Sequence, residues 1–101
     1  MGFEYQFSIT VPHGLSPDEV GTALKLSGRY TLLPLPNQEL ALTYTGVPQR
    51  ANWPEDIVLQ FTETQIGAVI HSGTKHQREM FITDLSTVLK ATGLHFEMEE
   101  L

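Results

Sequence analysis

The chain contains no cysteine among its 101 residues. A disulfide framework, a thiolate zinc site and a cysteine nucleophile are therefore excluded. Long apolar runs are also missing, since none approaches the roughly 20 residues that a helix needs to cross a bilayer. The first residues lack the basic segment and apolar run of a signal peptide, and Gln6 stands where a myristoylation motif needs Ser or Thr. These absences predict a soluble, cytoplasmic protein with no membrane contact.

Basic residues are scarce. Six Lys and Arg stand against twelve Asp and Glu, which gives a formal net charge of -6 and a pI near 5.0. Such a surface repels phosphate backbones and attracts basic partners, so the composition argues against nucleic-acid binding and favours a basic protein partner. The plainer explanation of the same charge is that it keeps the protein in solution.

Familiar catalytic motifs are missing as well. The chain has no Gly-x-Ser-x-Gly elbow, no zinc-protease histidine pair and no dinucleotide fingerprint. Gly73-Thr74-Lys75 opens a predicted helix and could attract an anion, but a phosphate loop needs a longer glycine-bracketed cradle. Helix capping by Thr74 already accounts for these residues. No cofactor and no functional metal are predicted.

What the sequence does contain is a clear alternation of apolar and polar residues at positions 3–11. Phe3, Tyr5, Phe7, Ile9 and Val11 alternate with polar residues at every even position. Successive side chains of a strand point to opposite faces, so this segment predicts a strand with one face on a core. The other face of the sheet is expected to be polar and uncovered.

Two helices are predicted from their caps. Ser16, followed by Pro17 and by Glu19 three residues after the cap, predicts a capping box and a helix over 17–27 that Gly28 ends. Thr74 and Gln77 repeat the capping pattern before a second helix, which Gly93 ends. Its apolar stripe consists of Phe81, Leu85, Val88 and Leu89.

Five further segments predict strands, and Pro34 places the first of them at a sheet edge. They cover 30–35, 39–45, 56–62, 66–71 and 94–99. The order β-α-β-β-β-β-α-β predicts a single α+β domain over 1–101, a two-layer sandwich with both helices on one face of a mostly antiparallel sheet. This architecture is ferredoxin-like with an extra hairpin. We expect one core that includes Phe7, Leu24, Leu59, Phe61, Phe81 and Leu85.

Histidines are the residues that titrate near neutral pH, and three of them could form a site. His71 ends a predicted strand and His76 lies in the first helical turn that follows, so the two could share a ligand with His95 or Glu79. Their spacing matches no established metal pattern, which favours solvent-facing histidines at an element junction. A small ferredoxin-like enzyme or ligand-binding protein with a site near these histidines is the alternative function.

The leading hypothesis is protein binding. The irregular segment 46–55 carries Arg50 and Trp53, residue types that often dominate protein–protein affinity, although Trp53 could instead close the core. The last strand presents Glu97 and Glu99 on its outward side. Together with the acidic balance, these residues predict an inhibitor of the immunity-protein or antitoxin kind that blocks a basic toxin such as a nuclease. A homodimer formed through the polar sheet face is a third possibility.

Overall fold

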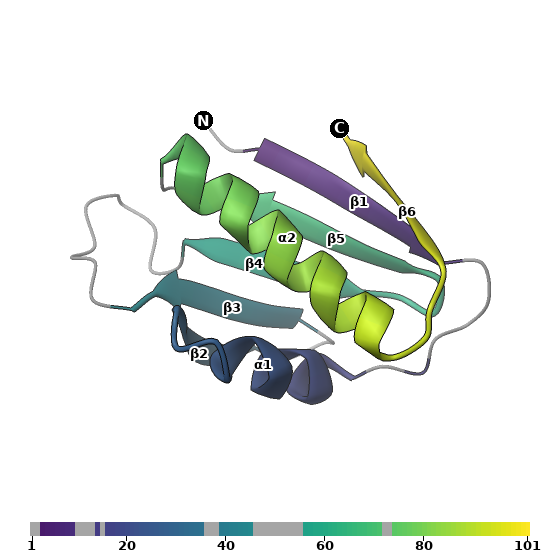
Figure 1. Ribbon diagram of the computed structural model, residues 1–101, viewed down its shortest axis with the longest axis horizontal. Coiled ribbons are helices and arrows are strands. Elements are labelled where there is room, and N and C mark those ends of the chain that lie inside the picture. Colours follow the sequence, from purple (N-terminus) through teal and green to yellow (C-terminus); the bar gives the residue numbers. More distant parts are fainter. Residues whose placement is uncertain (1–2, 10–13, 15, 36–38, 46–55, 72–73) are drawn as a thin grey trace.

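The computed structural model describes residues 3–9, 14, 16–35, 39–45, 56–71 and 74–101. Within these ranges the chain forms six strands and two helices in the predicted order (Figure 1). The elements are β1 (Phe3–Ile9), α1 (Pro17–Lys25), β2 (Tyr30–Leu35), β3 (Glu39–Tyr44), β4 (Ile57–Phe61), β5 (Gln65–Ile70), α2 (Lys75–Ala91) and β6 (Phe96–Glu100).

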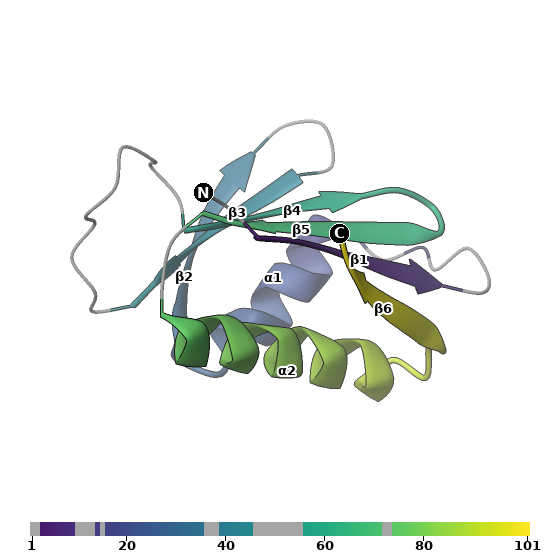
Figure 2. The same cartoon turned by 90° about the horizontal axis from the view of Figure 1, so that it is seen from above.

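The strands form one sheet in the order β2-β3-β4-β5-β1-β6, and every neighbouring pair is antiparallel. Both helices lie on the same side of this sheet, as Figure 2 shows. The fold is therefore a two-layer α+β sandwich. Each helix connects two strands that are not neighbours, and the β2–β3 hairpin extends a ferredoxin-like arrangement at one edge. Pro34 lies in the edge strand β2, as expected.

The core lies between the helices and one face of the sheet. All six residues predicted for it are buried, with at most 8% of the surface of any of them exposed. Leu85 and Phe81 of α2 and Leu24 of α1 meet Phe7 of β1 and the inward side of β4 in one cluster. The α1 helix approaches β2 and β3 closely at Gly21, where a Cβ atom would come within 3.1 Å of the Leu40 side chain.

Local signals explain most of the helix ends. The Thr74 hydroxyl accepts a hydrogen bond from the Gln77 N–H at 3.1 Å, and the Gln77 side chain accepts one from the Thr74 N–H at 2.8 Å. The predicted capping box of α2 is thus present in full. Gly28 and Gly93 follow the two helices with φ values of 77° and 80°, conformations that favour glycine.

Three details differ from the sequence-based expectation. In α1 the Ser16 hydroxyl accepts a hydrogen bond from the Glu19 N–H, but the reciprocal bond to the Glu19 side chain is not formed, and that side chain is exposed. The helix ends at Lys25 rather than Ser27. Phe3 remains 39% exposed at the end of β1, where its ring contacts the Arg78 guanidinium at 3.7 Å. Neither described helix is long and apolar enough to span a membrane.

Candidate functional site

The face of the sheet opposite the helices forms the first candidate site. Strand register places Glu4, Gln6 and Ser8 of β1 on this face, together with their partners across β5 and β6. Glu97 pairs with Ser8, and Glu99 pairs with Gln6. We call this surface the open face, because no described helix covers it (Figure 2).

Accessibility is uneven across the open face. Ala41 of β3 and Val58 of β4 point to this side and are 1% and 9% exposed, although neither belongs to the core beneath the helices. The carboxylates of β1 and β6 and the amides of Gln60 and Gln65 are exposed. A partner would therefore find its most accessible polar contacts over β4, β5, β1 and β6.

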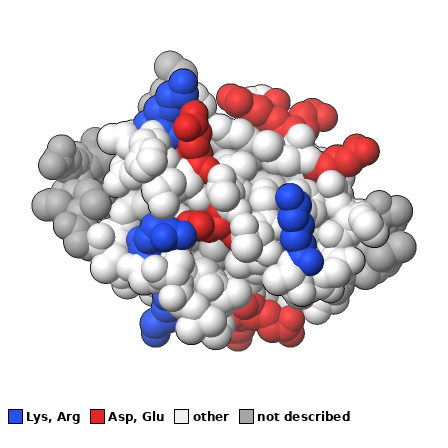
Figure 3. All heavy atoms as spheres, in the orientation of Figure 1, with Lys and Arg blue, Asp and Glu red and all other residues white. Residues whose placement is uncertain are grey.

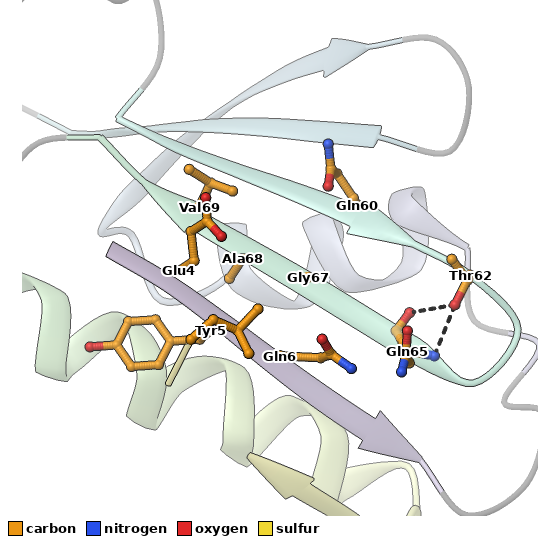
Figure 4. Close-up of a pocket in the computed structure, with 10 residues that line it drawn as sticks. Glu4, Tyr5, Gln6, Gln60, Thr62, Gln65, Gly67, Ala68 and Val69 are labelled. Carbon is orange, nitrogen blue, oxygen red and sulfur yellow. Dashed lines mark hydrogen bonds between the residues drawn. The ribbon is translucent and has the colours of Figure 1, made fainter. Parts of the chain in front are cut away.

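A shallow groove runs across these strands at Gly67. Gln6 of β1 and Gln60 of β4 are the direct neighbours of Gly67 in the sheet, and Figure 4 shows them on either side of it. The groove has a volume of about 200 Å³, and its lining also includes Glu4 and Val69. A Cβ atom on Gly67 would meet only the Gln60 Oε1 atom, at 3.9 Å. The groove thus exists because position 67 has no side chain.

The described basic residues are confined to one side of the sheet. The open face carries the carboxylates of Glu4, Glu39, Glu97 and Glu99, and register places no described Lys or Arg there. The described basic residues lie on the helices or just before β2: Lys25, Arg29, Lys75, Arg78 and Lys90. Figure 3 views the helical side, where basic and acidic side chains are interspersed. The open face is therefore the side with the more uniform negative charge.

A second hollow lies on the helical side, where the start of β2 and the end of β3 meet the first turns of α2. Its volume is about 210 Å³, and its walls include Arg29, Tyr30, Tyr44, Gln77 and Met80. We call it the tyrosine pocket. Tyr30 and Tyr44 lie side by side with ring centroids 6.2 Å apart, and Tyr30 packs edge-on against Phe81.

One wall of the tyrosine pocket is fixed by a clamp on Asp84. The Arg29 guanidinium donates two hydrogen bonds to this carboxylate, at 3.0 and 2.6 Å, and the Tyr30 hydroxyl donates a third at 2.6 Å. Burial, followed by the hydrogen bond to Asp84, raises the pKa of Tyr30 above its ordinary value. The clamp joins the start of β2 to the middle of α2.

Tyr44 differs from Tyr30 in lacking such a partner. It is 8% exposed, and its hydroxyl is the buried side-chain polar atom without a hydrogen-bond partner in the described structure. Burial, reinforced by the Asp56 carboxylate, raises the pKa of Tyr44 to about 12. The phenol is therefore protonated at neutral pH and remains a donor without an acceptor.

The sequence-predicted binding residues fall into two groups. Glu97 and Glu99 lie on the open face, as the alternation of the last strand predicted, and both are exposed. Arg50 and Trp53 lie outside the described residues, so their part in binding stays a prediction.

The three histidines are not brought together. His71 is half-buried after β5, and His76 is exposed in the first turn of α2. His95 follows the other end of this 17-residue helix, which is about 25 Å long. Within the described ranges, no group of three or more His, Asp or Glu side chains is placed to hold a metal ion. The shared site of the alternative hypothesis is not assembled.

Sequence reasoning missed Gly67 and Tyr44. An isolated glycine inside a strand pattern marks a place where another group can approach the backbone, so Gly67 carried a usable signal. No local pattern distinguishes Tyr44 from Tyr30. The difference between the two hydroxyls depends on Asp84, which is 54 residues from Tyr30 in sequence.

Comparisons with protein-family models, curated proteins and solved structures find no match to this chain.

Proposed function

We propose that this protein is a stoichiometric binding module whose open face covers a basic protein, as an inhibitor of the immunity-protein or antitoxin kind covers a nuclease or similar toxin. The observation that carries the proposal is the uniform sign of charge on the open face. Four carboxylates share a sheet face on which no described Lys or Arg lies.

The chemistry of the open face favours a basic occupant. Complementary charge steers association and disfavours wrong partners. Glutamine side chains beside the groove add hydrogen-bonding groups, and the missing side chain at Gly67 leaves space for a protruding group of the partner. A lysine or arginine side chain matches both the space and the carboxylate of Glu4.

A symmetric dimer through the open face is less favourable. In a two-fold interface the same patch occurs on both subunits, so the carboxylates of one copy would face those of the other. Like-charge juxtaposition at an interface is costly. A partner of opposite charge avoids this repulsion, which is why we favour a hetero-complex over the homodimer.

The test compares two charge-reversal variants with the same change in net charge. Glu97→Lys with Glu99→Lys alters the open face, whereas Glu19→Lys with Glu79→Lys alters exposed positions on the two helices. Each protein is immobilised, exposed to a lysate of the source organism and, after elution, assayed for 1:1 complexes. We expect the wild type and the helix variant to retain the same basic protein and the strand variant to lose it.

Two further results decide whether binding means inhibition. The purified partner should lose its own activity at a 1:1 ratio with the wild-type protein, and the loss should weaken at high salt. Equal retention by the strand variant, or retention with no effect on the partner's activity, would count against the proposal. The sequence-based expectation for Trp53→Ala is a faster dissociation rate with unchanged folding.

The groove supplies an independent variant. Gly67→Val adds a side chain into open space and replaces a flexible residue by one that strands favour. We expect a fold at least as stable as the wild type and weaker partner binding. Unchanged binding would show that the partner does not use the groove.

A further inference from the structure

The two edges of the sheet differ in the backbone hydrogen bonds that they can still offer to another chain. β6 forms one edge, beside β1, and β2 forms the other (Figure 1). In an antiparallel sheet, alternate residues of a strand direct their N–H and C=O groups to the neighbours on its two sides. An edge strand therefore leaves every second residue unpaired.

The register of β1 shows which residues these are. The Ile9 N–H donates a hydrogen bond to the Thr64 carbonyl at 2.8 Å, so the odd-numbered residues of β1 pair with β5. The Leu101 N–H donates to the Glu4 carbonyl, also at 2.8 Å, so the even-numbered residues of β1 pair with β6. The two printed bonds agree on a single alternation along β1.

The same alternation defines the free edge of β6. Glu97 and Glu99 lie opposite even-numbered residues of β1, so their backbone groups are directed to that strand. The N–H and C=O groups of Phe96, Met98 and Glu100 point the other way, and no described strand pairs with them. Every residue of β6 except the half-buried Phe96 is exposed. This edge is therefore accessible to a further strand.

The opposite edge is less complete. The Thr45 N–H donates to the Arg29 carbonyl, so Tyr30, Leu32 and Pro34 direct their backbones outward from β2. Proline has no N–H, and Pro34 thus removes one donor from the β2 edge. β6 contains no proline. An added strand finds the fuller set of donors and acceptors at β6.

The side chains of β6 differ between the two faces of the sheet. Glu97 and Glu99 lie on the open face. Met98 lies opposite Phe7, and so on the helical side, where it is 44% exposed. Phe96 is on the same side and packs against Phe7 with ring centroids 5.7 Å apart. An added strand would therefore have carboxylates beside it on one face and apolar side chains on the other.

A second copy of this chain is a poor occupant of the β6 edge. If β6 paired with itself about a two-fold axis at Met98, Glu97 of one copy would lie opposite Glu99 of the other. Glu100 adds a third carboxylate to the strand. Like charges directly opposite each other in a sheet are destabilising, whereas opposite charges stabilise the pair. Charge complementarity thus favours a basic strand.

We propose that β6 binds an extended segment of the basic partner as a further antiparallel strand, with Lys or Arg side chains beside Glu97 and Glu99 and apolar side chains beside Phe96 and Met98. Strand addition takes its affinity from main-chain hydrogen bonds and its specificity from alternate side chains. The antiparallel direction continues the pattern of the whole sheet. The inference rests on the proposed function, because it assumes a basic partner, and it adds how that partner is held.

The experiment uses the heptapeptide acetyl-Lys-Val-Lys-Val-Lys-Val-Lys-amide as the probe, titrated into ¹⁵N-labelled protein. Amide hydrogen exchange is measured residue by residue by NMR. With the peptide at about ten times its Kd, exchange at Phe96, Met98 and Glu100 should slow by about tenfold, because these N–H groups gain acceptors. The amides of Glu97 and Glu99 already bond to β1 and should change less. The same peptide with Glu in place of Lys should not bind.

Two methylated peptides of unchanged charge separate strand pairing from simple charge attraction. In the antiparallel register the valines lie opposite Phe96, Met98 and Glu100, so the valine N–H groups face β6 and the lysine N–H groups face solvent. Methylation of the valine nitrogens should therefore abolish binding. Methylation of the lysine nitrogens should leave binding intact.

A pair of variants tests the edge from the side of the protein. Met98→Pro removes an N–H at the free edge and none that bonds to β1, as Pro34 does in β2. Met98→Ala removes the same side chain and keeps the N–H. We expect the proline variant to bind the peptide about tenfold more weakly than the alanine variant, with thermal melting confirming that both are folded. If Met98→Pro does not fold, the two methylated peptides decide the question.

The results separate this inference from the proposed function. Slowed exchange at Phe96, Met98 and Glu100, together with selective loss of binding by the valine-methylated peptide, supports strand addition. No binding of the basic peptide, equal binding of the acidic one, or equal binding of both methylated peptides overturns it. Slowed exchange at the same three amides on raising the concentration of the protein alone would identify a second copy as the occupant and also overturn it.

The basic protein captured from the lysate gives the last comparison. Weaker capture by Met98→Pro than by Met98→Ala supports strand addition. If both variants capture it equally while Glu97→Lys with Glu99→Lys loses it, the partner uses the open face without the edge. The proposed function then stands and strand addition fails.

Discussion

The three tyrosines allow the hydrogen-bonding argument to be tested by the smallest possible change, deletion of one hydroxyl at a time. Tyr30, Tyr44 and Tyr5 are all mostly buried, with exposed fractions of 3%, 8% and 9%. Their hydroxyls differ in environment. Tyr30 donates to Asp84, Tyr44 has no partner, and Tyr5 is neither paired with a described side chain nor counted among the buried unpartnered atoms. Substitution by Phe should therefore change the free energy of unfolding differently at each of the three sites.

For Tyr44→Phe we expect a gain in the free energy of unfolding of about 1 kcal/mol, because an unsatisfied buried hydroxyl costs about 1–3 kcal/mol. Tyr30→Phe should lose about 1.5–3 kcal/mol, the usual contribution of a hydrogen bond to a charged group. Tyr5→Phe should stay within about 0.5 kcal/mol of the wild type. In a domain of this size 1 kcal/mol shifts Tm by about 4–8 °C, so the order of the variants is measurable.

Urea denaturation and thermal melting provide the measurement. A loss of more than about 0.5 kcal/mol in Tyr44→Phe would refute the reasoning, because it would show that the hydroxyl has a stabilising partner. A neutral Tyr30→Phe would show that the hydrogen bond from Tyr30 to Asp84 adds nothing to stability.

Three further predictions concern stability. Burial raises the pKa values of Tyr30 and Tyr44 above the ordinary 10, so the folded state keeps two protons that the unfolded chain loses at high pH. The contribution of these two groups to stability is therefore constant below about pH 10 and falls above it by up to about 1.4 kcal/mol per pH unit for each of the two, measured by urea titration, with a shallower fall in Tyr44→Phe. Leu85→Ala should cost about 2–5 kcal/mol, and a cost below about 0.5 kcal/mol would place Leu85 outside the core. Thr74→Ala should cost about 1 kcal/mol by thermal melting, and no loss would mean that the capping box is dispensable.

The sequence predicted the fold well because its signals were local. The alternation of β1, the caps at Ser16 and Thr74, and Pro34 in an edge strand each act over a few residues. The glycine at position 67 also had a local meaning. The alternation of β1 by itself predicted a polar, uncovered sheet face.

The tyrosine pocket could not be predicted in the same way. Its walls come from β2, β3 and α2, and the clamp that fixes one of them joins Arg29 to Asp84 across 55 residues. Which tyrosine has a partner depends on the strand order and on the rotation of α2, neither of which follows from periodicity. The three histidines do not form one shared site for a related reason. The length of α2 separates His76 from His95.

The acidic side of β6 has two explanations that the charge-reversal variant separates. β6 is an edge strand, and charged residues on an edge prevent pairing with other chains. On this explanation Glu97→Lys with Glu99→Lys should leave the protein monomeric, because lysine protects an edge at least as well as glutamate. If recognition of a basic partner is the reason, the same variant stays monomeric but loses the partner, because the charge that steers association has changed sign. Size-exclusion chromatography of the variant therefore gives the same result under both explanations, and partner binding alone distinguishes them.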